Sequence, residues 1–210
     1  MPLLYDNCRE SGYSGATTPI AILSGFHEAW NKRIFNAKLS GHRDVLAKMT
    51  HRPYGDVVHK FLALEGFAPD YLGTCDLDHD GAPRMHVMEK LGHSWVTLAD
   101  WGGRVHSPWD PAGLLDRVHN SIMKIIDLLE GKGYVHGDLQ STNIMVDRDT
   151  FRIKVVDFDW AGEAGKTYYP IDRNDEINYW PEGSRNGCPI ALGDDRVLVQ
   201  NWWRDFIEKA

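Results

Sequence analysis

The sequence predicts an α+β protein in two parts, with a β-rich N-terminal part followed by a helical C-terminal part. Short apolar runs alternate with turn residues between residues 20 and 89, which is typical of strands. Two later segments, at residues 110–131 and 194–207, carry apolar residues at helical spacing. Between them, short apolar runs at residues 144–147 and 153–156 predict a β-hairpin.

The N-terminal segment, residues 1–18, is rich in Gly, Ser, Thr and Asn without a regular period. It is predicted to be a poorly ordered arm or a cover over the first strands. Three strands are predicted next, at residues 20–23, 33–39 and 44–49.

An amphipathic helix is predicted at residues 54–65, with Gly66 as its stop. Two further strands follow, at residues 67–75 and 84–89. We therefore expect a β-rich lobe with one helix at residues 19–89 and a helical lobe at residues 90–210.

The strongest helix signal lies at residues 110–131. Asp110 suits the N-cap, Pro111 the first helical position and Gly131 the stop. Apolar residues three and four positions apart predict one buried stripe, made of Leu114, Leu115, Val118, Ile122, Ile125, Ile126 and Leu129.

Composition and charge restrict the class of protein. With 210 residues, 42% of them hydrophobic, the chain is large enough for a hydrophobic core. It has no apolar run of about 18 residues and no signal-peptide pattern at its start, so we expect a cytoplasmic protein without a membrane span. The net charge of −7 argues against a nucleic-acid partner, because phosphate contacts supply affinity there. Cys8, Cys75 and Cys188 form no Cys-x-x-Cys pair and predict reduced thiols.

Polar residues that point to chemistry lie between residues 134 and 160. A His-Gly-Asp turn ends at Asp138, and Asn143 follows five residues later at the start of the hairpin. Asp157 follows the second hairpin strand and begins an Asp-Phe-Asp sequence. Moving a phosphoryl group from ATP requires hard oxygen ligands for Mg²⁺ and a carboxylate beside the acceptor hydroxyl. These three side chains, held by a rigid hairpin, can supply both.

This set resembles the catalytic loop and metal-binding motif of the protein-kinase-like superfamily, His-Arg-Asp-Leu-x4-Asn followed by Asp-Phe-Gly. Gly137 stands in the place of the Arg, Gln140 in the place of a Lys, and Asp159 in the place of the Gly. The combination resembles the aminoglycoside and choline phosphotransferase branch and small fungal protein kinase-like proteins. The resemblance implies a two-lobed kinase-like fold with a compact, shortened C-terminal lobe that binds ATP and Mg²⁺.

The resemblance also implies roles around the catalytic loop. Asp138 would orient the acceptor hydroxyl and take its proton, while Asn143 and Asp157 would bind Mg²⁺. His136 would have a structural role near the metal-binding Asp. The terminal helix, which begins at Asp194 and Asp195, resembles a buried helix whose leading Asp binds amides of the catalytic loop.

Further roles concern the nucleotide. Lys48, at the end of the third predicted strand, would contact the α- and β-phosphates. Asp56 of the following helix would pair with Lys48, with Glu65 as the alternative. Three residues of the connection between the lobes would lie along the adenine: Met88 as the gatekeeper, Glu89 through its C=O and Leu91 through its N–H.

The acceptor stays open between a protein Ser or Thr and a small molecule. An alternative is a pseudokinase that binds a nucleotide or a partner, supported by Gln140, by the short C-terminal lobe and by a first turn whose only glycine is Gly25. A third interpretation, a fragment of a larger enzyme, predicts exposed apolar surface on the terminal helix.

Overall fold

The computed structural model describes residues 3–10, 17–25, 34–39, 43–76, 83–102 and 113–209. The chain forms two compact units. The sheet unit contains Met1–Tyr54 and Pro69–Leu91, and the helical unit contains Gly55–Ala68 and Gly92–Ala210. The helix that follows the fourth strand therefore groups with the helical unit.

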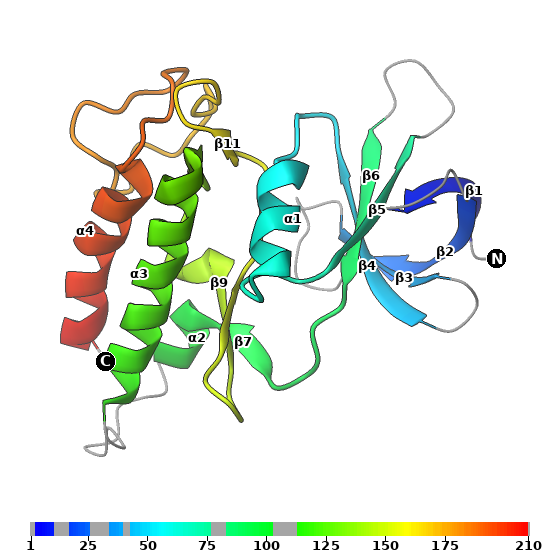
Figure 1. Cartoon of the computed structure of the whole chain (residues 1–210), viewed down its shortest axis with the longest axis horizontal. Helices are drawn as coiled ribbons and strands as arrows, with labels where there is room; N and C mark the ends of the chain where they lie inside the picture. The colour runs from blue at the N-terminus through cyan, green and yellow to red at the C-terminus, as the bar shows by residue number, and fades with distance from the viewer. Residues whose placement is uncertain are drawn as a thin grey trace. The chain divides into compact units, whose positions relative to one another are not determined.

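Six antiparallel strands form a closed barrel in the sheet unit (Figure 1), in the order β1, β2, β3, β4, β6, β5. They are β1 (Leu3–Glu10), β2 (Thr17–Gly25), β3 (Ile34–Leu39), β4 (Arg43–Thr50), β5 (Tyr71–Asp76) and β6 (Arg84–Glu89). The five strands predicted from the sequence correspond to β2 to β6, although the strand predicted at residues 67–75 begins only at Tyr71. Their inward side chains make one core of Ile20, Ala37, Val45, Ala47, Cys75, Met85 and Val87.

Two expectations about this unit are corrected by long-range pairing. Where a poorly ordered arm or a cover was predicted, β1 is a strand that pairs with both β2 and β5. Cys75 is disulfide-bonded rather than reduced, and Cys188 is a free thiol. The register places Cys8 of β1 opposite Cys75 of β5. The pairing of β1 joins residues far apart in the sequence, which local composition does not encode.

The helical unit combines helices with two small sheets. Its helices are α1 (Asp56–Leu64), α2 (Leu98–Gly102), α3 (Leu114–Lys132) and α4 (Asp194–Lys209), with one 3₁₀ turn, η1 (Ser141–Asn143). One sheet has the order β10 (Ile153–Val155), β9 (Ile144–Asp147), β7 (Trp95–Thr97). The other pairs β11 (Gly162–Glu163) with β8 (Tyr134–Val135). The predicted hairpin is thus confirmed as β9 and β10.

Helix α3 buries its predicted stripe, apart from Leu115, which is half-buried. Its end differs from the prediction, because the helix continues through Gly131 and stops at Gly133. Gly133 adopts a left-handed φ of 70° that favours glycine, and its N–H donates to the Glu130 carbonyl. The predicted start at Asp110 and Pro111 lies outside the described residues, and the described helix begins after Gly113.

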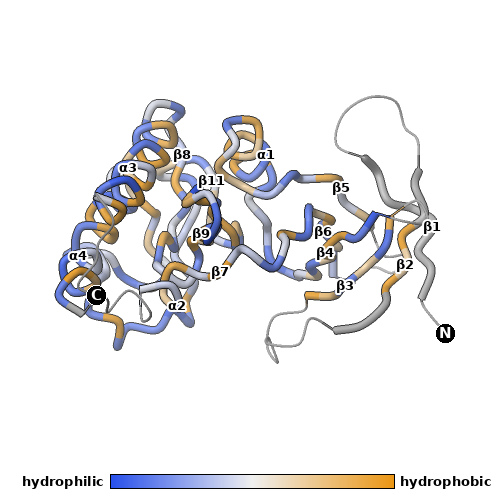
Figure 2. The backbone as a smooth tube through the Cα atoms, turned by 90° about the horizontal axis from the view of Figure 1, so that it is seen from below, coloured by the Kyte–Doolittle hydropathy of each residue, from blue (hydrophilic) through white to orange (hydrophobic). Residues whose placement is uncertain are grey.

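Helix α4 lies beside α3 (Figure 1) and packs an apolar face against the unit. Figure 2 shows hydrophobic and hydrophilic positions alternating along both helices. Leu198, Val199 and Trp202 are buried, whereas Val197 and Ile207 of the same helix are 39% and 46% exposed. Within the described part of the chain, no helix is both long and apolar enough to cross a membrane.

Arg196 ties α4 to α3 through a fork of hydrogen bonds. Its Nε and Nη2 donate to the two carboxylate oxygens of Glu130 at 3.0 and 2.7 Å, and Nη2 also reaches Asp127 at 2.7 Å. Replacing Arg196 with Met is expected to lower the free energy of unfolding by about 1 kcal/mol, because bidentate, partly exposed pairs are worth about that much.

Urea unfolding of wild type and Arg196→Met at low salt and at about 1 M salt tests this prediction. Salt screens the ion pairs of Arg196, so the difference in the free energy of unfolding should be smaller at high salt. Arg204→Met is the matched control, because the Arg204 side chain is 74% exposed. Equal stability of wild type and Arg196→Met at low salt would show that the fork contributes nothing.

Candidate active site

The loop that joins β8 to η1 carries the His-Gly-Asp turn, and a buried aspartate of α4 holds its backbone. Asp195 Oδ2 accepts the His136 N–H at 2.6 Å, and Oδ1 accepts the Gly137 N–H at 2.9 Å. Burial raises the pKa of the Asp195 carboxyl to about 6, although both loop N–H groups favour its ionised form. Two turns further along α4, the Trp202 indole N–H donates to the Leu139 carbonyl at 3.0 Å. Helix α4 therefore supports the loop at two points.

His136 is buried and has its ring tautomer set by its neighbours. Its Nδ1 accepts the Asp138 N–H at 3.3 Å, so Nε2 carries the proton and donates to the Val156 carbonyl at 3.2 Å. The ring also meets the Phe158 ring edge to face, with centroids 5.1 Å apart. These contacts hold the loop against the residues around Asp157, which is a structural task.

Gly137 is required by the shape of the turn. Its φ is +80°, and a Cβ there would lie 2.6 Å from Ile190 Cδ1 and 3.1 Å from the Trp160 carbonyl oxygen. A larger side chain at this position would be strained by the left-handed φ, would displace the end of the Ile190 side chain and would crowd the Trp160 carbonyl. The structure thus explains why this chain has Gly where the kinase pattern has Arg.

The Asp138 carboxylate is held by two side-chain amides. Asn143 Nδ2 donates to Asp138 Oδ2 at 2.8 Å and to the Asp138 carbonyl at 2.9 Å. Gln140 Nε2 donates to Asp138 Oδ1 at 2.5 Å. Asn143 is buried, whereas Asp138 and Gln140 are half-buried. The turn therefore presents an oriented carboxylate.

Asp157 is joined to this group through the backbone. The Val156 N–H donates to the Asn143 carbonyl at 2.9 Å, continuing the pairing of β9 with β10. Asp157 itself has a φ of 69°, a left-handed value that is rare for a residue other than glycine. Such strain costs on the order of 1–3 kcal/mol and is concentrated at functional sites. The Asp138 and Asn143 side chains are therefore hydrogen-bonded to each other, and Val156, the residue before Asp157, is hydrogen-bonded to the Asn143 backbone.

Phe158 anchors the Asp-Phe-Asp sequence in the core. It is fully buried, and its ring stacks on His59 of α1 with centroids 4.4 Å apart and planes 7° apart. Its carbonyl accepts the Gly55 N–H at 2.9 Å, just before α1. The start of α1 is therefore fixed on the segment that carries Asp157.

The side-chain oxygens of Asn143 and Asp157 are suitable ligands for Mg²⁺. Asn143 uses its amide nitrogen on Asp138, so its amide oxygen is the atom that can serve a metal, and Asp157 offers a carboxylate. Mg²⁺ prefers such hard oxygens and keeps several of its waters. Among the residues that the structure describes, no three His, Cys, Asp or Glu side chains form a metal cluster by themselves. An ion bound by one amide oxygen and one carboxylate keeps further coordination positions for phosphate oxygens and water.

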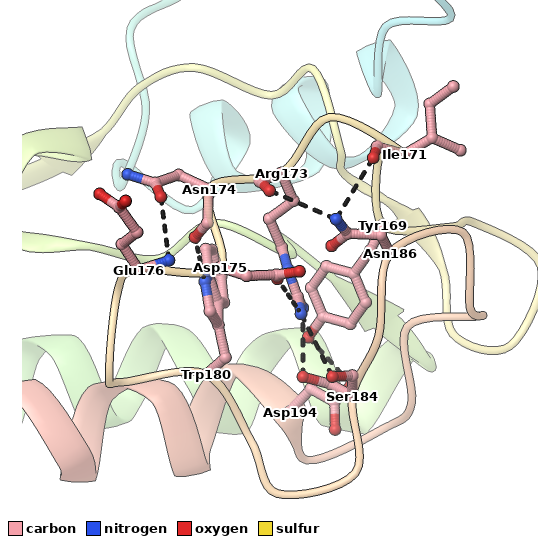
Figure 3. A network of polar contacts seen from close by, with 10 residues as sticks. All are labelled: Tyr169, Ile171, Arg173, Asn174, Asp175, Glu176, Trp180, Ser184, Asn186 and Asp194. Atoms are coloured by element: carbon pink, nitrogen blue, oxygen red, sulfur yellow. Dashed lines mark hydrogen bonds and ion pairs between the residues drawn. The ribbon is translucent and has the colours of Figure 1, made fainter.

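The segment between β11 and α4 is organised around a buried arginine (Figure 3). Arg173 lies over the rings of Tyr169 and Trp180, 4.5 and 4.6 Å from their centroids. Its guanidinium donates to Asp175 Oδ1 at 2.9 Å, to Ser184 Oγ at 3.1 Å and to the Ser184 carbonyl at 3.2 Å. The segment is thus packed around a charged centre.

Two tyrosines attach this segment to α4. The Tyr169 hydroxyl donates to Asp194 at 3.0 Å, and the Tyr179 hydroxyl donates to Asp205 at 2.9 Å. Burial and the nearby Asp194 raise the pKa of Tyr169 far above its usual range, so it stays a neutral donor. Asn201 also donates to the Tyr179 carbonyl at 3.0 Å.

In the sheet unit, Lys48 is buried, with its Nζ 5.5 Å from the centre of the Tyr54 ring. Tyr54 in turn stacks on His86, which shares a 2.9 Å hydrogen bond with the Tyr71 hydroxyl. In the helical unit, Asp56 forms a 2.7 Å ion pair with Lys60 of the same helix. The predicted pairing of Asp56 with Lys48 stays a prediction.

The predicted adenine-binding residues lie at and just after the end of β6. Met88 is half-buried within the strand, and Glu89 is its last residue. The Glu89 N–H donates to the Asp70 carbonyl at 2.9 Å, and its carboxylate accepts the Asp70 N–H at 3.1 Å. The adenine contacts assigned to Met88, Glu89 and Leu91 stay predictions.

Comparison with known proteins identifies the fold. No family model matches the sequence, and no curated protein matches it. Among solved structures, the chain is similar to the Cydia pomonella Granulovirus kinase, PK-1, at 15% sequence identity and a TM-score of 0.64. The match covers 91% of this chain and 69% of the viral one. This likeness shows the fold alone, so the chain has the predicted α+β protein-kinase-like fold with a shortened helical lobe.

Proposed function

We propose that this chain is a phosphotransferase that moves the γ-phosphoryl group of ATP, with Mg²⁺, to the hydroxyl of an acceptor. The acceptor is a protein Ser or Thr, or a small alcohol. The observation that carries the proposal is the contact between Asp138 and Asn143, together with the bond from Asn143 to the residue before Asp157. The kinase-like fold shared with a viral kinase supports it.

In this proposal, Asp138 receives the acceptor hydroxyl as a hydrogen-bond donor and takes its proton as the oxygen bonds to the γ-phosphorus. The bond from phosphorus to the β–γ bridging oxygen breaks, and ADP leaves. Asn143 and Asp157 would hold Mg²⁺, which would supply charge neutralisation at the phosphates. Lys48 contacts the α- and β-phosphates, and the backbone of Glu89 and Leu91 binds the adenine edge.

The residues around Asp138 favour phosphoryl transfer over a protein that only binds a nucleotide or a partner. A module that only binds a nucleotide or a partner needs no carboxylate oriented by two amides. An acceptor hydroxyl needs such a group, because its proton must be placed on an atom within hydrogen-bond reach.

Mg²⁺-dependent release of ADP from ATP, measured with pooled protein and small-alcohol acceptors, tests the proposal. Asp138→Asn is expected to lower turnover by roughly 100-fold or more, because the variant loses the proton acceptor. Asp149→Asn is the matched control, since Asp149 is exposed in the turn between β9 and β10. Thermal unfolding of each variant verifies that the fold is retained.

Two outcomes would contradict the proposal. Equal ADP release by wild type and Asp138→Asn would exclude Asp138 from the reaction. No release by the folded wild type, despite ATP binding measured by calorimetry, would favour a pseudokinase that acts as a nucleotide-binding module.

A further inference from the structure

Gln140 contacts the proposed proton acceptor directly. Its Nε2 lies 2.5 Å from Asp138 Oδ1, while Asn143 Nδ2 lies 2.8 Å from the other carboxylate oxygen, Oδ2. The two amides thus contact different oxygens of one carboxylate. Rotation of the Asp138 carboxylate about its last side-chain bond would break both contacts.

The side chain of Gln140 has a local alternative that it does not use. Gln140 occupies the N-cap position of η1, yet no side chain caps this turn. Its backbone already fixes the loop, because its N–H donates to the Asp138 carbonyl and its C=O accepts the Asn143 N–H, both at 2.9 Å. The side-chain amide is therefore the part of Gln140 that is committed to the carboxylate.

The chemistry of an amide suits this task. An amide N–H is neutral, so it orients a carboxylate without the full charge that an ammonium would place beside it. A carboxylate oxygen has two lone pairs, so Oδ1 and Oδ2 can each accept one amide and still accept an acceptor hydroxyl. The two amides therefore fix the orientation of the Asp138 carboxylate and leave a lone pair that can accept a hydrogen bond from the acceptor hydroxyl.

We propose that Gln140 is a positioning residue, which acts through Asp138 by holding its carboxylate in the direction needed for the acceptor hydroxyl. This inference rests on the proposed phosphotransferase function and adds a role to it. In the sequence, Gln140 in the place of a Lys supported a pseudokinase. With a positioning role, the same residue supports an active phosphotransferase.

Steady-state turnover of three variants tests the role. Gln140→Met, which matches the length without a donor, is expected to lower kcat by about 10- to 100-fold and to change the KM for ATP by about twofold at most. Gln140→Lys restores a donor but adds a full charge beside the carboxylate, so it should recover only part of the lost kcat. Gln140→Glu places an acceptor beside the carboxylate and should lose more than Gln140→Met. A residue that only fills space would show the reverse order, with Met tolerated best and Lys and Glu both worse.

A second measurement does not depend on activity. The chain contains two glutamines, Gln140 and the exposed Gln200, so glutamine-selective ¹⁵N labelling yields two side-chain amide groups, each with a pair of N–H signals. Gln200→Met assigns them and serves as the control with unchanged turnover. We expect one Gln140 amide proton to exchange slowly with water, and Asp138→Ala to abolish that protection.

The outcomes separate this inference from the function on which it rests. Active wild type with unchanged kcat in Gln140→Met would overturn the positioning role and leave the proposed function standing. Unprotected Gln140 amide protons in an active protein would overturn the contact itself. A wild type without turnover would overturn the proposed function, and the positioning role would fall with it whatever the amide signals show.

Discussion

Replacing Asp195 with Ala is expected to destabilise the protein more at pH 4 than at pH 7. At pH 7 the free energy of unfolding should fall by about 2 kcal/mol. Two buried N–H groups, of His136 and Gly137, lose their acceptor, at about 1–3 kcal/mol each. Removing a buried charge offsets part of that cost.

The sign of the pH dependence follows from the raised pKa. The Asp195 carboxyl has an ordinary pKa of 3.8 when it is exposed to water and a pKa of about 6 in the fold. Between these values the folded protein binds more protons than the unfolded chain, so the stability contributed by this group falls as pH rises. The contribution is complete below about pH 4 and is lost through about pH 6. A shift of this size corresponds to roughly 3 kcal/mol, so the loss in Asp195→Ala should grow to about 5 kcal/mol at pH 4.

Urea unfolding of wild type and Asp195→Ala across pH 4–7 measures the difference, in which the other titrating groups largely cancel. Asp149→Ala, at an exposed position, is the control and should show a small effect that changes little with pH. A loss that is the same at both ends of the range, or larger at pH 7, would contradict the burial of the Asp195 charge.

Replacing Arg173 with Ala is expected to lower the free energy of unfolding by about 3 kcal/mol. The side chain, 3% exposed, donates to Asp175 and Ser184 and lies over the rings of Tyr169 and Trp180. Hydrogen bonds from a charged group contribute about 1.5–3 kcal/mol each and a desolvated cation–π contact up to about 2 kcal/mol, and these terms do not add in full.

Urea unfolding measures this loss, and two further variants define its cause. Arg173→Lys keeps the charge but not the flat fork that stacks on both rings, so it should lose roughly half as much. Arg185→Ala, in the same segment but exposed, should change stability by less than about 0.5 kcal/mol. If Arg173→Lys matches the wild type, charge alone explains the site and stacking contributes nothing.

The sequence determined the elements whose signals are local. The stripe of α3 follows from residues three and four positions apart, and the hairpin of β9 and β10 follows from two short apolar runs with a turn between them. The spacing of Asp138, Asn143 and Asp157 led to the kinase-like fold, because each of these residues lies at a defined place around that hairpin. A local pattern is sufficient for such features, since the residues involved are neighbours in the chain.

The tertiary structure decided which residues make the contacts that join distant segments. The resemblance predicts that a leading aspartate of the terminal helix binds amides of the catalytic loop, and the packing of α4 places Asp195 there, 59 residues from His136 in the sequence. The closure of the barrel by β1 depends likewise on long-range pairing. A helix that passes Gly131 and ends at Gly133 reflects which glycine reaches a left-handed φ in the packed chain.

Gln140 also shows what the sequence determines and what only the structure determines, although its partner Asp138 is close by in the sequence. The sequence identifies it as a departure from the kinase pattern, but not whether its amide caps η1, meets solvent or binds Asp138. Rotamers of a long side chain are chosen by the surrounding packing rather than by local sequence. In this protein the fold places the Gln140 amide on the Asp138 carboxylate, because the turn between β8 and η1 is held by α4 and brings both side chains to one side.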